Sequence, residues 1–248
     1  MLRRNLPDLF TLANLLFGCI GIQLVLKGEP ILACYTILIS GIFDFFDGMV
    51  ARALKINNPH GKDLDSLADV VSFGVLPGFL AMTLITGADE FYYGKIWLMG
   101  FETPQGLIYL SYVAFLIPIL SAYRLAKFNH DTRQTDSFIG LPTPANALFW
   151  CGLVVGIDAG IWWLIASPVV IVFLSVFFSF MLLAPLPMFS FKMKNFGWNT
   201  NRLRYIFLLC CAPLLILFKI AGLAAVIILF ILFSIFQQLG SKNETEAL

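Results

Sequence analysis

Residues 30–86 read PILACYTILISGIFDFFDGMVARALKINNPHGKDLDSLADVVSFGVLPGFLAMTLIT, and this stretch decides what kind of fold the chain can adopt. Two apolar runs, 30–51 and 66–86, are each close to the roughly 20 residues that a helix needs to cross a hydrocarbon core about 30 Å thick. A short polar turn joins them, which predicts two antiparallel membrane helices. Five acidic residues stand at the facing ends of the runs, namely Asp44, Asp47, Asp63, Asp65 and Asp69. Because carboxylates at the edge of a membrane span are costly, we expect them to be functional.

The rest of the chain is equally apolar. Of its 248 residues, 59% are hydrophobic and 12% are charged, whereas soluble domains average about 45–50% and about 25%. These numbers exclude a water-soluble globule, a disordered chain, collagen, a coiled coil and a disulfide-stapled module. The net charge of +1 gives no reason to expect nucleic acid as a partner. The predicted class is an all-α polytopic membrane protein.

Hydropathy predicts eight membrane spans. We expect each of them to be a helix, because a lipid-exposed backbone must satisfy its own hydrogen bonds. The expected spans are about 9–26, 30–51, 66–86, 106–126, 144–160, 163–186, 203–218 and 220–237. We expect one transmembrane catalytic domain over 1–240 and a polar, frayed tail over 241–248.

The positive charges predict the orientation. With eight spans, one side of the membrane carries thirteen of the sixteen Lys and Arg residues. These are Arg3, Arg4, Arg52, Lys55, Lys62, Arg124, Lys127, Arg133, Lys192, Lys194, Arg202, Arg204 and Lys242. Since basic loops stay in the cytoplasm, both termini and the acidic turn are expected to face the cytoplasm from the inner cell membrane.

The spacing of the acidic residues predicts that they form one site. Asp44 and Asp47 are three residues apart, and Asp65 and Asp69 are four apart, so each pair shares one helix face. The polar turn brings the two faces together at the membrane edge. Four carboxylates there would repel one another unless a cation joined them. Oxygen ligands without a nearby His or Cys on that face favour Mg²⁺ or Mn²⁺.

Two neighbours of the carboxylates support a ligand site. Gly48 costs about 1 kcal/mol relative to Ala inside a helix, which the close approach of a ligand would explain. Arg52, one turn later, offers a guanidinium fork for phosphate. The competing interpretation is that the carboxylates cap helices or pair with Arg52, Lys55 and Lys62. The size of the array favours the metal site.

The same residues resemble the CDP-alcohol phosphotransferase signature without a mismatch. That pattern is Asp, two residues, Asp-Gly, two residues, Ala-Arg, eight residues, Gly, three residues, Asp, three residues, Asp. Here it falls on Asp44, Asp47, Gly48, Ala51, Arg52, Gly61, Asp65 and Asp69. The resemblance implies an integral membrane enzyme that cleaves a CDP-linked lipid such as CDP-diacylglycerol, releases CMP and passes the phosphatidyl group to an alcohol.

The resemblance also implies roles for individual residues. The four signature aspartates would bind one or two divalent ions, and Asp69 would deprotonate the acceptor. The CDP moiety would be bound by Gly48, Arg52 and Gly61, and by Asn58 in the turn, where members of the family bring a polar side chain to the nucleotide. Many members form homodimers. Asn14, in the first span, either reaches the cytidine or bonds a neighbouring helix.

Three further segments indicate the acceptor. LPDLFTLANLLFGCIGI (6–22), DVVSFGVLPG (69–78), and the pair YRLAKFN (123–129) and FIGLPTPANA (138–147) resemble membrane-embedded phosphatidylserine synthases of bacteria and archaea. The resemblance implies L-serine as the acceptor. Arg124, Lys127 and Arg133 could then bind the serine carboxylate, although Lys127 and Arg133 fit equally well as ordinary cytoplasmic charges.

Two alternatives remain at this stage. A related enzyme could use glycerol 3-phosphate or inositol phosphate, which would call for a denser basic pocket. A divalent-cation transporter would use the carboxylates as its transport site, but such sites usually lie near the bilayer midplane.

Overall fold

The computed structural model describes residues 6–56, 59–87, 109–130, 139–189 and 197–246. These residues are almost entirely helical, and the only β-pairing among them is an isolated bridge between Ile139 and Pro187. The α-helices are α1 Leu6–Leu26, α2 Pro30–Ala53, α3 Pro59–Val70, α4 Leu76–Thr86, α7 Leu116–His130, α8 Thr143–Asp158, α9 Pro168–Met181, α10 Trp198–Phe218 and α11 Gly222–Glu246. A π-helix, η2, covers Val71–Val75, and 3₁₀ turns cover Tyr112–Phe115 (η4), Trp163–Ile165 (η5) and Lys219–Ala221 (η6). The predicted all-α class is confirmed.

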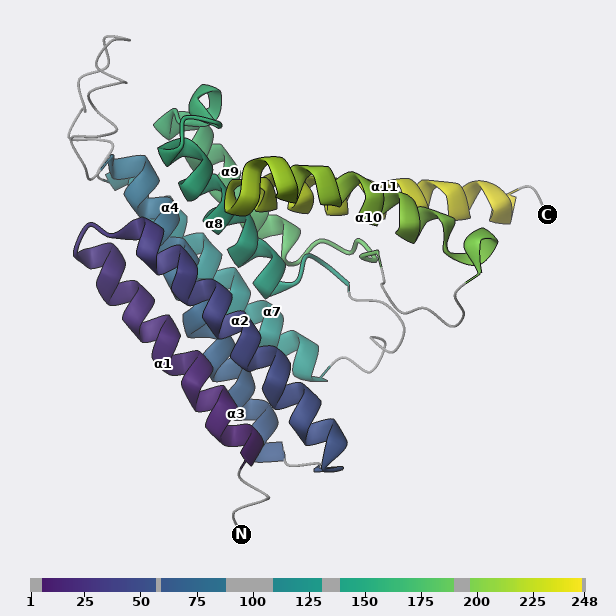
Figure 1. The fold of residues 1–248 in the computed structure, drawn as a ribbon, viewed down its shortest axis with the longest axis horizontal. Helices are drawn as coiled ribbons and strands as arrows, with labels where there is room; N and C mark the ends of the chain where they lie inside the picture. The colour runs from purple at the N-terminus through teal and green to yellow at the C-terminus, as the bar shows by residue number, and fades with distance from the viewer. Residues whose placement is uncertain (1–5, 57–58, 88–108, 131–138, 190–196, 247–248) are drawn as a thin grey trace.

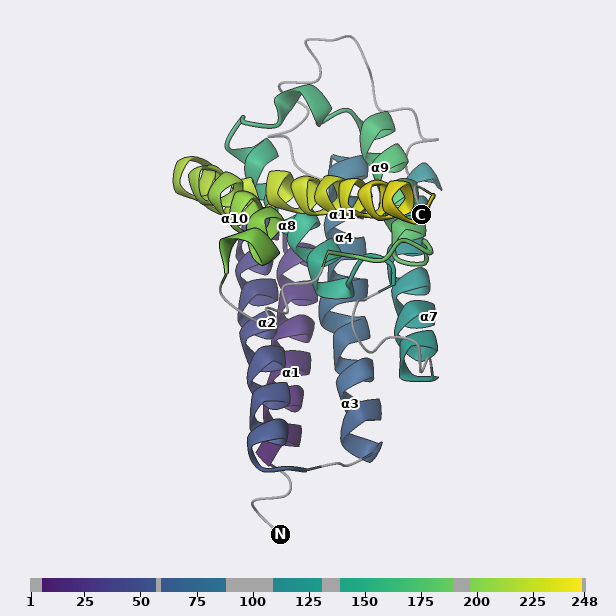
Figure 2. The same ribbon diagram turned by 90° about the vertical axis from the view of Figure 1, so that its right-hand side faces the viewer.

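The helices up to α9 form a bundle, and the last two lie across it (Figure 1). In both views α1 and α2 run side by side, and α3 continues through η2 into α4 (Figure 2). The helices α10 and α11 contact each other, and α11 packs on α8. The ends of α1, α2 and α3 project from the bundle on the side where the N-terminus lies (Figure 1). This projecting end contains the acidic turn.

Five helical stretches of the described residues are long and apolar enough to cross a membrane: 6–26, 30–53, 59–86, 109–129 and 201–239. The first four correspond to the first four predicted spans. Of the remaining helices, α8 has 16 residues and α9 has 14, and the last stretch contains both α10 and α11. The count of eight spans is therefore not confirmed, because the predicted spans 144–160 and 163–186 hold shorter helices and the pair α10–α11 crosses the bundle.

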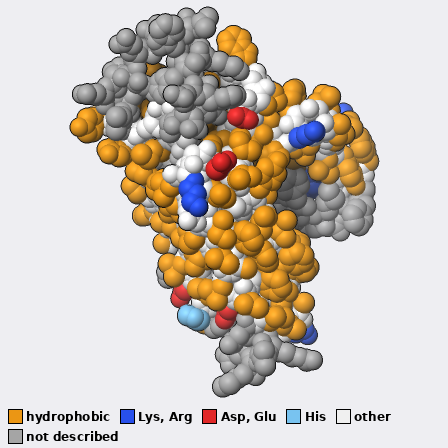
Figure 3. Space-filling view, turned by 60° about the vertical axis from the view of Figure 1, so that its left-hand side comes forward, with side chains coloured by type: hydrophobic (Ala, Val, Ile, Leu, Met, Phe, Trp, Pro, Cys, Tyr) orange, Lys and Arg blue, Asp and Glu red, His pale blue; other side chains and the backbone are white. Residues whose placement is uncertain are grey.

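The surface fits a membrane protein. One face carries a broad band of hydrophobic side chains with charged ones gathered above and below it (Figure 3). Large apolar side chains are exposed on several helices, among them Leu9, Leu16 and Ile42 on the α1–α2 side. Exposure on this scale is expected where lipid covers the surface.

Local sequence explains where helices begin and end. Pro30 starts α2 two residues after Gly28, whose φ of 79° allows the tight α1–α2 connection. Gly87 ends α4 in the left-handed conformation, with its N–H bonded to the Thr83 carbonyl. The last helix, α11, continues to Glu246, into the segment predicted as a polar tail.

The third membrane element is longer than predicted, because its helix begins at Pro59 rather than near residue 66. Its π-helix begins at Val71, two residues after Asp69. Such bulges occur often at functional sites. Close packing surrounds this bulge: a methyl group added at Gly18 of α1 would overlap Ser72, and one added at Gly74 would lie 3.1 Å from Cβ of Ser121 on α7.

The apolar core lies on the other side of the π-helix from the acidic turn. Leu76 and Leu80 of α4 are fully buried there, together with Trp150 of α8. Phe149 of α8 stacks on Phe178 of α9 with ring centroids 3.7 Å apart. This core holds the helices in the register that positions the site.

Candidate active site

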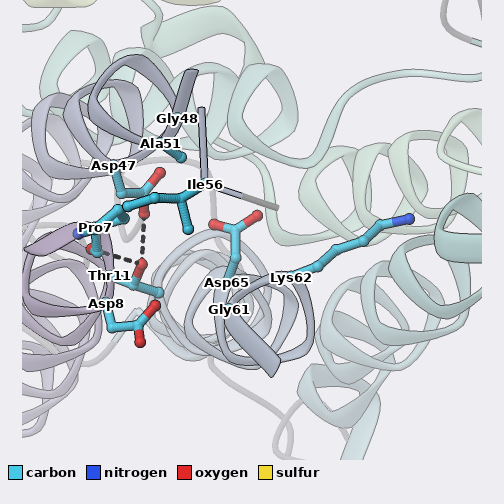
Figure 4. A pocket seen from close by; sticks show the side chains of 10 residues that line it. All are labelled: Pro7, Asp8, Thr11, Asp47, Gly48, Ala51, Ile56, Gly61, Lys62 and Asp65. Atoms are coloured by element: carbon cyan, nitrogen blue, oxygen red, sulfur yellow. Dashed lines mark hydrogen bonds between the residues drawn. The ribbon is translucent and has the colours of Figure 1, made fainter. Parts of the chain in front are cut away.

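A pocket of about 300 Å³ opens between the projecting ends of α1, α2 and α3 (Figure 4). It is lined by Pro7, Asp8, Thr11, Asp47, Gly48, Ala51, Ile56, Gly61, Lys62 and Asp65. Asp47 from α2 and Asp65 from α3 face each other across it (Figure 4). The structure thus joins both halves of the acidic turn in one cavity.

The carboxylates of Asp44, Asp47 and Asp65 converge. One oxygen from each lies within 4.8 Å of the other two, as expected when three ligands surround one cation. Oδ1 of Asp65 is buried and has no hydrogen-bond partner. A buried acceptor without a partner is costly, and a bound cation would remove that cost. The donor set therefore fits a hard divalent ion.

Asp69 supplies the fourth carboxylate from the next turn of α3. It is buried, and it interacts with the Asp44 carboxyl group. Nδ2 of Asn14 donates a hydrogen bond to Oδ1 of Asp69 at 3.1 Å. The backbone carbonyl of Asn14 accepts hydrogen bonds from Ser40 at 3.1 Å and Ser72 at 3.0 Å. Asn14 therefore bonds a neighbouring helix, and its contact with the cytidine stays a prediction.

Thr11 is a site residue that the sequence reasoning missed. Its hydroxyl donates to Oδ2 of Asp47 at 2.8 Å, with the Pro7 carbonyl as a second acceptor at 3.2 Å. Asp8 also lines the pocket. A signal was present, since the buried positions of this apolar helix recur every three or four residues and carry small or polar side chains. These positions are Pro7, Thr11, Asn14, Gly18 and Gly21, and the series ends on the apolar Val25.

Of the residues expected to bind the nucleotide, some line the pocket and others do not. Gly48 and Gly61 line the pocket, and a methyl group added at Gly48 would meet only the Arg52 side chain, at 3.9 Å. The space beside Gly48 is thus open to a ligand. Nε of Arg52 bonds the Gly48 carbonyl at 3.0 Å, and the side chain lies outside the pocket lining. Asn58 lies outside the described residues.

The residues expected to bind serine also differ in where they lie. Arg124 of α7 is buried, lies 5.9 Å from the centre of the Phe128 ring, and interacts electrostatically with Asp69. Its Nε has no hydrogen-bond partner. Lys127 is exposed, and Arg133 lies outside the described residues.

The basic residue that lines the pocket, Lys62, forms its hydrogen bond elsewhere. Nζ of Lys62 bonds the Asn129 carbonyl at 3.0 Å, and the Asn129 amide donates to Ser66 at 2.8 Å. The Lys62 side chain accordingly points away from Asp65 (Figure 4). These bonds join α3 to α7 and leave the carboxylates without Lys62 as a counter-charge.

The comparisons with known proteins agree with this geometry. The family model described as CDP-alcohol phosphatidyltransferase matches residues 4–181, which include all four carboxylates. The chain belongs to the CDP-alcohol phosphatidyltransferase family. The family match ends at the last residue of α9, so the crosswise pair α10–α11 lies beyond it.

Several curated members of this family are similar to the chain. A CDP-diacylglycerol–serine O-phosphatidyltransferase of Helicobacter pylori is 34% identical over 144 residues, covering 57% of this chain and 54% of the relative. An archaetidylserine synthase of Methanothermobacter thermautotrophicus is 35% identical over 145 residues, covering 58% and 54%. A CDP-diacylglycerol–serine O-phosphatidyltransferase of Bacillus subtilis is 32% identical over 140 residues, covering 56% and 69%. The chain thus spans about half the length of the first relatives and over two thirds of the last.

Proposed function

We propose that this protein transfers the phosphatidyl group of CDP-diacylglycerol to the hydroxyl of L-serine, giving phosphatidylserine and CMP. The observation that carries the proposal is the convergence of the signature carboxylates in an open pocket at the end of α2 and α3. The similarity to serine-using relatives supports the acceptor.

The four aspartates would hold one or two Mg²⁺ or Mn²⁺ ions. A divalent ion there would neutralise the pyrophosphate of the donor and the charge that develops on the departing CMP. Asp44, Asp47 and Asp65 supply its oxygen ligands, with Asp69 beside them. Thr11 and Asn14 hold two of these carboxylates in place through their hydrogen bonds.

The proposed reaction is a direct displacement. The serine hydroxyl gives its proton to Asp69, and its oxygen forms a bond to the phosphorus on the diacylglycerol side. The bond from that phosphorus to the bridging oxygen breaks, and CMP leaves with the electron pair. If Asp69→Asn bound metal normally and retained wild-type turnover, the assignment of Asp69 as the base would be wrong.

CMP release by the purified protein in detergent tests the function. With CDP-diacylglycerol and Mn²⁺ or Mg²⁺, we expect L-serine to stimulate CMP release and phosphatidylserine to form. A chelator should abolish both. CMP release only with glycerol 3-phosphate or inositol phosphate would overturn the serine assignment and keep the reaction class. Turnover only with an ether-linked donor would instead point to the activity named for the archaetidylserine relative.

The proposal includes a location and an assembly. We place the carboxylate pocket and both termini on the cytoplasmic side, with α8 to α11 completing eight spans in a homodimer. The count of basic residues supports the orientation. Labelling single cysteines introduced at Lys62 and Lys27 should show cytoplasmic access only for the first. Light scattering of the purified protein should give the mass of two chains.

A further inference from the structure

The first two turns of α8 carry buried polar atoms that no protein group satisfies. Oγ1 of Thr143 has no hydrogen-bond partner, and neither has Oδ1 or Nδ2 of Asn146. Both side chains are 0% exposed. Leaving a buried donor or acceptor unpaired costs about 1–3 kcal/mol. A buried amide without partners for its oxygen or its nitrogen therefore indicates that a polar ligand binds there.

These atoms face the π-helix. Cys151 of α8 exchanges hydrogen bonds with Cys34 of α2, which fixes one side of α8. Phe149 stacks on Phe178 of α9 and fixes another. At 3.6 residues per turn, Asn146 lies in the stripe between these two sides. The start of α11 packs against Gly152, on a third side of α8. Besides α11 and the turn η6 that leads into it, the elements that contact α8 are η2 and α4.

Register places Asn146 at the level of Ser40, beside the residues that hold Asp69. The helices α8 and α2 are antiparallel (Figure 1). From the paired cysteines, Asn146 lies five residues towards the acidic end on α8, and Ser40 lies six residues in the same direction on α2. At about 1.5 Å per residue these distances are similar. Ser40 and Ser72 both bond the carbonyl of Asn14, whose side chain bonds Asp69.

A second set of buried polar atoms without hydrogen-bond partners lies on the α7 side of the π-helix. Helix α7 also contacts η2, and Ser121 of α7 packs against Gly74. Arg124 follows one turn closer to the acidic end. Oγ of Ser121 and Nε of Arg124 are buried without partners. Unpaired polar atoms thus flank the π-helix, which begins two residues after Asp69, on two sides.

The start of α8 is held rigidly. Gly140 has a φ of 78°, and its N–H bonds the Leu186 carbonyl at 2.9 Å. The N–H of Leu141 bonds the Met181 carbonyl at 2.9 Å. Pro142 precedes the helix, and no side chain caps its first turn. The uncapped N–H groups of a helix start favour an anion such as a carboxylate.

We propose that Thr143 and Asn146 form the part of the acceptor pocket that recognises a free amino acid. The inference rests on the proposed function and adds the residues that select its substrate. Thr143, the helix start and Nδ2 of Asn146 donate to the carboxylate, and Oδ1 of Asn146 accepts from the ammonium group. A phosphorylated alcohol offers Oδ1 only neutral hydroxyl donors, whereas a zwitterion offers an ammonium group to Oδ1 and a carboxylate to Nδ2.

Asn146→Leu, which keeps the branched shape of the side chain and removes both polar ends, tests the proposal. The assay measures CMP release by the full-length protein with Mn²⁺, varying L-serine and CDP-diacylglycerol separately. We expect kcat/KM for serine to fall at least 20-fold, with KM for CDP-diacylglycerol within about threefold of wild type. Ethanolamine, which has the hydroxyl and amine of serine but no carboxylate, serves as the second acceptor. The ratio of kcat/KM for serine to that for ethanolamine should fall at least tenfold.

Ser175→Ala is the matched control, because the buried Ser175 hydroxyl is already satisfied by the Ile171 carbonyl. Ser175→Ala should change neither kcat/KM for serine nor the serine-to-ethanolamine ratio. If Asn146→Leu does not fold, Thr143→Val gives the same comparison with a smaller change. An unaltered serine-to-ethanolamine ratio in the folded variant would mean that only water pairs these atoms and would overturn the pocket. If L-serine does not stimulate CMP release by the wild-type protein, the proposed function itself is overturned, which is a separate outcome.

Discussion

Removing the Thr11 hydroxyl should weaken metal binding without disturbing the fold. Thr11→Val keeps the shape of the side chain and deletes one donor. That donor lies 2.8 Å from Oδ2 of Asp47 and 3.2 Å from the Pro7 carbonyl. It has one hydrogen, and the shorter contact to a charged acceptor is the stronger of the two. The variant therefore leaves the Asp47 carboxylate without its fixed orientation.

The size of the effect follows from that single bond. A hydrogen bond to a charged group contributes about 1.5–3 kcal/mol, and about 1.4 kcal/mol corresponds to a tenfold change in affinity. We therefore expect Mn²⁺ affinity to fall roughly 10- to 100-fold, the range that loss of an outer partner of a metal ligand usually gives.

The assay follows free Mn²⁺ by electron paramagnetic resonance during titration of the detergent-solubilised protein. Thr36→Val is the control, because Thr36 is also buried but its hydroxyl bonds the Ala33 carbonyl of its own helix at 2.7 Å. The control should bind Mn²⁺ as the wild type does. A Thr11→Val protein whose dissociation constant stays within threefold of the control would refute the role of Thr11.

Two other substitutions test the packing and the Asp69 contact. Gly18→Ala should lower the melting temperature by several degrees, because its methyl group would overlap Ser72 and overpacking costs about 1–3 kcal/mol. Gly41→Ala, where no atom lies within 4 Å of the added methyl group, should not, and equal melting temperatures would contradict the packing. Asn14→Leu should reduce kcat at least tenfold at saturating substrates by releasing Asp69 from its hydrogen bond at 3.1 Å, and unchanged kcat would remove Asn14 from the site.

The sequence predicted the helical class and the four carboxylates well, because both depend on local periodicity. A helix puts residues three or four apart on one face, so Asp44 with Asp47 and Asp65 with Asp69 had to form pairs. The short turn between the runs then brought the pairs together. The convergence of Asp44, Asp47 and Asp65 within 4.8 Å confirms this part of the prediction.

The contacts made by the first helix were harder to predict, since they depend on tertiary packing. The spacing of Thr11 and Asn14 marks one packing face of α1, but it does not indicate that this face would lie against both α2 and α3. The span count is not confirmed for a related reason. Hydropathy shows that 163–186 is apolar, but it does not reveal that the α-helix covers only Pro168–Met181. Nor does hydropathy show that α10 and α11 lie across the bundle.

The central claim is that the serine hydroxyl attacks the donor phosphorus in this pocket. Supplying L-serine labelled with ¹⁸O in its hydroxyl, together with CDP-diacylglycerol and Mn²⁺, tests it most directly by mass spectrometry of the products. The account predicts phosphatidylserine that carries the label in its serine–phosphorus bridge, and CMP that carries none. Phosphatidylserine without the label, or phosphatidic acid as the only lipid product, would contradict it.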